Sequence, residues 1–211
     1  METTLRQGLG WGILAIAAFA LFGASAVLAR SATQTEAPVV WFDDPAVEAG
    51  TSTLLRTQDG IRMTIKTTDL DPRGTYTVWW VIFNNPEECA LEEVDHCVED
   101  DLFNAATGPS ILYAAGHVVS PNGKGNFAGS LRAGDVRGCQ PPWDGFDLCG
   151  EGLEDPAGAE VHLVIRTHGE KVPGMVNEQI GTFAGGCTAE SSFGAGDGPN
   201  ECVDQQFAIH Q

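Results

Sequence analysis

Four histidines, His117, His162, His168 and His210, are the side chains of this chain best suited to bind a transition metal. Neutral imidazole is a common ligand of copper and zinc. Alternation along an extended strand places His162 and His168 on one side, but about 20 Å apart at about 3.3 Å per residue, too far for one ion to join them. A copper or zinc site therefore requires a fold that brings His117 beside His162, or His168 beside His210.

A second set of candidate ligands is acidic and lies around Cys89 and Cys97. Calcium takes about six to eight oxygen ligands, and a loop closed by a disulfide would hold carboxylates close together. The segment has no EF-hand spacing. It predicts either a calcium site or a solvated acidic surface. The candidate calcium ligands are Glu92, Asp95, Glu99, Asp100 and Asp101.

Motifs of common enzymes are absent from the sequence, which has no G-x-S-x-G, no H-E-x-x-H and no phosphate-binding glycine loop. Glu160, Arg166 and His168 would share one strand face and could form a cluster of acid and base groups. An enzyme of unknown reaction is therefore an alternative to a binding protein. Convergence of these three side chains in a deep pocket would favour it.

The six cysteines fall into three couples that are close in sequence and flanked by Gly, Pro and acidic residues. An even number of cysteines in an exported chain is typical of disulfides. A structural zinc site is the alternative, but no C-x-x-C pair is present. We therefore expect the disulfides Cys89–Cys97, Cys139–Cys149 and Cys187–Cys202.

The N-terminal residues have the features of a secretory signal: Arg6, an apolar run over 12–28, and small residues before a cleavage site after Ala29. The sequence therefore predicts a signal peptide over 1–29, a flexible segment over 30–37 and one domain over 38–211. The predicted location is the periplasm or the cell exterior. An uncleaved anchor is the alternative, because the apolar run of about 26 Å nearly matches a bilayer core of about 30 Å.

Charge narrows the choice of partners. The chain has 29 acidic and 11 basic residues and a formal net charge of −18. Phosphate binding needs clustered Lys and Arg, so nucleic acid and anionic membrane surfaces are excluded as partners. A cation, an extracellular protein or a glycan remains.

Helix patterns are scarce beyond the N-terminal segment, whereas short alternating runs bounded by turn residues recur. The run 75–84 is apolar on both faces and is expected to be a central strand. Asn122-Gly123 favours a tight turn between two strands. These patterns predict an all-β fold, and we expect a two-sheet antiparallel β-sandwich with long disulfide-stapled loops. The expected strands are 39–42, 53–57, 61–67, 75–84, 110–119, 125–131, 159–167 and 203–209.

Four segments carry a resemblance to a known family. They are Thr167-His168-Gly169-Glu170-Lys171-Val172-Pro173-Gly174, Tyr76 to Pro86, Leu112 to Asn126, and Gln206-Phe207-Ala208-Ile209-His210. Together they resemble a family of exported bacterial β-domain proteins whose function is not known, so the resemblance implies no function. The His-Gly turn alone also resembles the chordin-type extracellular β-domain.

The leading hypothesis from the sequence is an exported, non-enzymatic binding or structural protein of the cell envelope or exterior that holds a cation or a partner through its acidic loops. Copper or zinc binding through the histidines is the alternative, and an enzyme of unknown reaction is the second alternative.

Overall fold

The computed structural model describes residues 32–90, 94–139, 148–191 and 196–211. The predicted signal peptide, 1–29, lies outside these residues. Within the described part of the chain, no helix is long and apolar enough to cross a membrane.

The protein is all-β, as the alternating runs predict, and a strand is present at each of the eight expected places. The strands are β1 (Thr33–Trp41), β2 (Glu48–Thr57), β3 (Gly60–Thr67), β4 (Thr75–Phe83), β5 (Pro109–Val118), β6 (Gly125–Arg132), β7 (Glu160–Thr167) and β8 (Val203–His210). The helical elements are short: the 3-10 turns η1 (Pro86–Glu88), η2 (Glu99–Phe103) and η3 (Ala105–Thr107), and the helix α1 (Val176–Gln179).

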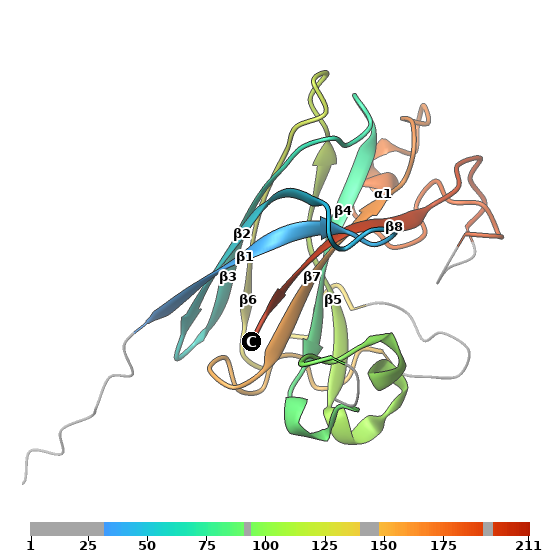
Figure 1. Cartoon of the computed structure of the whole chain (residues 1–211). Helices are drawn as coiled ribbons and strands as arrows, with labels where there is room; N and C mark the ends of the chain where they lie inside the picture. The colour runs from blue at the N-terminus through green and yellow to red at the C-terminus, as the bar shows by residue number, and fades with distance from the viewer. Residues whose placement is uncertain (1–31, 91–93, 140–147, 192–195) are drawn as a thin grey trace, which may run out of the picture.

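The expected division into two sheets is not confirmed. The strands form one antiparallel sheet in the order β5-β4-β7-β8-β1-β2-β3-β6. Its halves are joined where β1 meets β8, through the pairs Val40 with Phe207 and Trp41 with Gln206 (Figure 1). Strand count and alternation do not specify which strands are neighbours, so the sequence could not distinguish one sheet from two.

The first strand, β1, begins earlier than the expected strand over 39–42. Residues 33–37, part of the segment predicted to be flexible, belong to β1. Their side chains are mostly exposed, which explains the weak hydrophobic pattern. The backbone is ordered by its ladder with β2, which runs from Thr33 opposite Arg56 to Val40 opposite Glu48. Pairing with β2 therefore orders this segment, although its side chains show no clear hydrophobic pattern.

Strand β4 is central, as predicted, and is buried along its whole length. Its inner face, with Val78 and Trp80, packs in the main core. Its outer face, with Trp79, Val81 and Phe83, forms a second apolar cluster. That second cluster is completed by side chains from the loops: Cys89, Cys97, Leu102, Leu148 and Phe183.

The turn between β5 and β6 brings the two edge strands of the sheet together. Gly123 adopts φ 70°, which accounts for glycine in this turn. At Gly129 of β6, an added Cβ would lie 2.8 Å from the carbonyl oxygen of Ala114 in β5. The sheet therefore curls until its edges meet, and its shape is close to a barrel (Figure 1).

Three disulfides, Cys89–Cys97, Cys139–Cys149 and Cys187–Cys202, tie the long loops, and they are the pairs that the sequence spacing predicts. Because β4 and β7 are antiparallel, the loop after β4 and the loop after β7 leave opposite ends of the pair. Side chains of both loops lie on the outer face of β4.

Candidate ligand-binding site

Strand β7 carries the polar residues singled out in the sequence, and alternation places them as expected. Val161, Leu163 and Ile165 face the main core, so His162, Val164 and Arg166 lie on the outer side of the sheet. The register then decides which of the candidate ligands meet.

The structure brings neither predicted histidine pair together. His162 of β7 lies opposite Val81 of β4, whereas His117 lies opposite Tyr76 and hence level with Thr167 of β7. The two histidines are thus five strand positions, or about 16 Å, apart along the strands, and they also lie two strands apart across the sheet. His210 lies opposite Val161, at the other end of β7 from His168. No metal ion can be shared across these distances.

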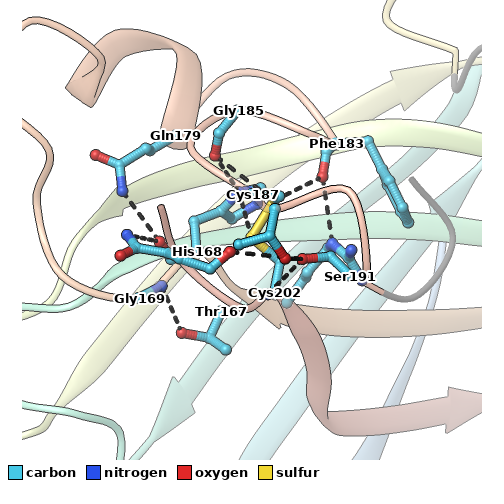
Figure 2. The surroundings of a disulfide bond; sticks show 12 residues. Thr167, His168, Gly169, Gln179, Phe183, Gly185, Cys187, Ser191 and Cys202 are labelled. Atoms are coloured by element: carbon cyan, nitrogen blue, oxygen red, sulfur yellow. Dashed lines mark hydrogen bonds between the residues drawn. A yellow bond between two sulfur atoms is a disulfide. The ribbon is translucent and has the colours of Figure 1, made fainter. Parts of the chain in front are cut away.

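His168 is completely buried against the Cys187–Cys202 disulfide (Figure 2). Its Nδ1 lies 2.8 Å from the Gly185 carbonyl oxygen, which only accepts, so Nδ1 carries the proton. Its Nε2 accepts from the Thr77 hydroxyl at 2.9 Å. The two sulfurs near the ring are bonded to each other, so this cluster of His168, Cys187 and Cys202 does not provide thiolates for a metal.

His210 and His117 also have structural surroundings. His210 is buried between two hydroxyls, with Nδ1 2.9 Å from Thr35 and Nε2 2.9 Å from Ser52. Burial first, and then the charges of Arg56 and His162, lower the pKa of His210 to about 4. The ring of His117 stacks on Phe127 with centroids 4.3 Å apart, and burial lowers its pKa.

The predicted calcium ligands are not gathered around one point. Asp101 is buried, and its carboxylate accepts the backbone N–H groups of Ala90 and Val98, so it holds its own loop in place. Asp95 is exposed and lies 3.3 Å from Nδ1 of His96. Glu92 lies outside the described residues. Within the described ranges, no three carboxylates have oxygens within 4.8 Å of one another.

The proposed acid and base cluster of Glu160, Arg166 and His168 is also divided. Glu160 accepts from His162 Nε2 at 2.6 Å and from the backbone N–H of Cys97 at 2.7 Å. Arg166 contacts Asp204, and His168 contacts Thr77 and Gly185. Within the described residues, Glu160 pairs with His162 and Arg166 pairs with Asp204, and none of the three candidate side chains lines the pocket on the outer face of the sheet.

A pocket lies instead on the outer face of the sheet, between the residues that follow the Cys89–Cys97 loop and those that flank the Cys187–Cys202 loop. These two loops are called the stapled loops below. The cavity volume is about 100 Å³. Its floor comes from the strands, with Trp79, Val81 and Phe83 of β4, Ile111 of β5, and His162 and Val164 of β7. Its walls come from η2 and flanking residues, with Val98, Glu99 and Leu102, and from Phe42, Phe183 and Asp204. The pocket is therefore lined mainly by apolar and aromatic side chains.

Two carboxylates reach this lining. Asp204 is 19 % exposed and pairs with the fully buried Arg166, with Oδ1 2.9 Å from Nη1. Burial raises the pKa of Asp204, an effect that the Arg166 charge opposes. Glu99 is exposed at the pocket edge. Partial burial, and then the negative charges of Asp204 and Asp100, raise its pKa.

Arg166 also orders the loop wall of the pocket. Its guanidinium carbon lies 4.2 Å from the centre of the Phe183 ring, and its Nε donates to the Phe183 carbonyl oxygen at 3.2 Å. Phe183 in turn meets Trp79 edge to face, with centroids 4.9 Å apart. One buried cation thus fixes both Asp204 and Phe183 at the pocket.

Sequence reasoning missed most of this site. Of the candidate residues that the structure describes, His162 and Glu99 line the pocket and the others do not. The sequence does not mark Trp79, Phe183 or Asp204 as parts of a site. One signal was present, since the second apolar face of β4, with Trp79, Val81 and Phe83, requires a cover that no strand pattern supplies. Nothing local indicates that Phe183 and Asp204, from distant segments, meet there.

Comparison with protein-family models, with curated proteins and with solved structures found no match to this chain. The lining of the pocket combines the aromatic side chains Trp79, Phe83 and Phe183 with the carboxylates of Glu99 and Asp204.

Proposed function

We propose that this protein is a non-enzymatic binding protein that holds a small ligand in the pocket between its two stapled loops. One observation carries the proposal: although the loops bury the outer face of β4, side chains of β4, β5 and β7 still line a cavity of about 100 Å³ beneath them. A concave, mostly apolar surface with a few polar groups is the usual form of a small-molecule site.

The disulfides support this proposal, because they reduce the freedom of the walls. Cys89–Cys97 closes the loop that leads into η2, and Cys187–Cys202 closes the loop that follows Phe183. Walls that are ordered before binding lose less conformational entropy when a ligand enters.

Export to the periplasm or the cell exterior is part of the same proposal. Structural disulfides persist in oxidising compartments. Three are present in this chain, and the described residues contain no free cysteine.

The test is a binding measurement on a variant with a filled pocket. We expect small aromatic molecules of the size of benzyl alcohol to bind with dissociation constants in the millimolar range, as is usual for so few atoms. Val164→Phe places a larger side chain in the pocket and should abolish binding. Val136→Phe, at an exposed position outside the pocket lining, is the matched control. Titrations followed by NMR would measure both, and equal binding by Val164→Phe and the unmodified protein would contradict the proposal.

Copper or zinc binding is the second candidate, and one observation favours it. The rings of His96 and His162 are neighbours, with centroids 6.1 Å apart. The Glu160 carboxylate holds His162 through Nε2, as carboxylates commonly orient metal-binding histidines. Calorimetric titration with Zn²⁺ or Cu²⁺ should then show binding that is lost in His96→Ala and in His162→Ala but kept in His117→Ala. Equal binding by all three variants would exclude this site.

A further inference from the structure

We propose that the ligand of the pocket is a protonated organic amine with a small flat apolar body, its ammonium group between Glu99 and Asp204 and its body over Trp79. This inference rests on the proposed function and names the class of ligand.

The charge balance at the pocket is negative. Within the described residues, the Glu99 carboxylate forms no side-chain hydrogen bond or ion pair, and the charges that act on it are those of Asp204 and Asp100. The nearby cation Arg166 does not line the pocket, and it already contacts Asp204 and the Phe183 carbonyl oxygen, two residues of the lining. An ammonium group between the two carboxylates would offset their repulsion. A carboxylate ligand would add to it.

The aromatic lining suits the same ligand. A cation is attracted to the face of an aromatic ring within about 6 Å of its centre, most strongly to Trp. Trp79 lines the floor of the pocket and Phe183 lines its wall. The Arg166 guanidinium already forms a cation–π contact with the Phe183 ring. The Trp79 ring is also held in place, because its Nε1 donates to the Thr77 hydroxyl at 2.8 Å.

Volume and overall charge restrict the ligand further. The cavity of about 100 Å³ is smaller than the roughly 150 Å³ of an apolar cavity known to hold benzene. The apolar body is therefore at most about one ring, partly open to solvent. The formal net charge of −18 concentrates cations near the protein, which speeds the arrival of an amine.

The experiment compares benzylamine, benzyl alcohol and benzoate, which share a ring and differ in charge. We expect benzylamine to bind about tenfold more tightly than benzyl alcohol, and benzoate to bind most weakly. Glu99→Gln should reduce the affinity for benzylamine about tenfold and leave that for benzyl alcohol unchanged. Asp100→Asn, the adjacent residue of η2, which does not line the pocket, should leave both unchanged.

The outcomes separate this inference from the proposed function. If benzylamine and benzyl alcohol bind equally, or benzoate binds most tightly, the proposal that the ligand is an amine is wrong. The proposal that the pocket binds a small molecule is then still supported. Equal losses of amine affinity in Glu99→Gln and Asp100→Asn also overturn it, since the effect is then one of general charge. If none of the three binds at millimolar concentration, the proposed function fails as well. Circular dichroism of each variant verifies that it is folded.

Discussion

The indole of Trp79 is held at the pocket floor by a chain of hydrogen bonds that ends beside a disulfide. Trp79 Nε1 donates to Thr77 Oγ1, and the Thr77 hydroxyl donates to His168 Nε2. His168 Nδ1 donates to the Gly185 carbonyl oxygen, next to Cys187. Thr77 and His168 each accept one hydrogen bond and donate another, so a single substitution leaves a buried donor or acceptor without a partner.

Thr77→Val tests this chain at the scale of one residue. Valine has nearly the shape of threonine, but it leaves Trp79 Nε1 and His168 Nε2 without their partner. We expect a loss of unfolding free energy of about 2–6 kcal/mol, since each of the two unsatisfied buried groups costs about 1–3 kcal/mol. Thr64→Val, on the exposed side of β3, is the control and should be close to neutral. Urea denaturation measures both, and similar stabilities would show that the chain contributes little.

Acid lability is a second prediction at this scale. Burial is the main cause that lowers the pKa values of His168 and His210 to about 4 from 6.5. Because the folded-state pKa lies below the unfolded one, the unfolded state binds protons first as the pH falls. The stability due to neutral histidine is therefore complete above pH 6.5 and is lost progressively down to about pH 4, with an upper limit of about 3 kcal/mol for each residue.

Urea denaturation at several pH values between these limits would follow the loss. His210→Gln keeps polar groups near Thr35 and Ser52 but does not titrate in this range, so its stability should fall less steeply with decreasing pH. The same pH dependence in this variant and in the unmodified protein would contradict the assignment.

At the scale of elements, the loops and their disulfides decide whether the pocket exists. The Cys187–Cys202 loop spans 15 residues, for which chain entropy predicts a stabilisation of about 3 kcal/mol. Replacing both cysteines by alanine should lower the unfolding free energy by about that amount and also weaken ligand binding, because the Phe183 wall loses its support.

Cys139→Ala with Cys149→Ala is the matched control for this prediction. It removes a disulfide that closes a loop of similar length, but only the Cys187–Cys202 loop is flanked by the lining residues Phe183 and Asp204. We expect reduced stability with unchanged affinity, measured by urea denaturation and by titration with benzyl alcohol. Equal loss of affinity in both double variants would mean that the pocket depends on overall stability rather than on one loop.

The closure of the sheet is a property of the whole molecule, and Gly129 is the place to test it. A side chain there would meet the Ala114 carbonyl oxygen across the β5–β6 edge and also the Met63 side chain. Gly129→Val should therefore cost about 1–3 kcal/mol, as overpacked sites do. It should also raise amide hydrogen exchange in β6. Ala128→Val, whose side chain is exposed, is the control. Unchanged exchange in Gly129→Val would show that the edges are not packed tightly.

Expectations from the sequence were most accurate for individual strands and least accurate for the site. The strands β3, β4 and β7 were predicted nearly to the residue, because alternation is a property of neighbouring residues. The start of β1 was missed, since Thr33 to Ala37 owe their order to β2. For the site, alternation correctly placed His162 on the outer side of β7, but it could not show that His117 lies about 16 Å along the sheet from it.

The sequence by itself determined the all-β composition, the positions of the strands and the cysteine couples, because each depends on residues close together in the chain. The tertiary structure alone decided that the strands form one sheet with meeting edges, that Glu99, Phe183 and Asp204 join Trp79 around one pocket, and that the predicted histidine pairs stay apart. The physical reason is that these contacts join segments tens to more than a hundred residues apart. Which of them form depends on the packing free energy of the whole fold and not on any local pattern.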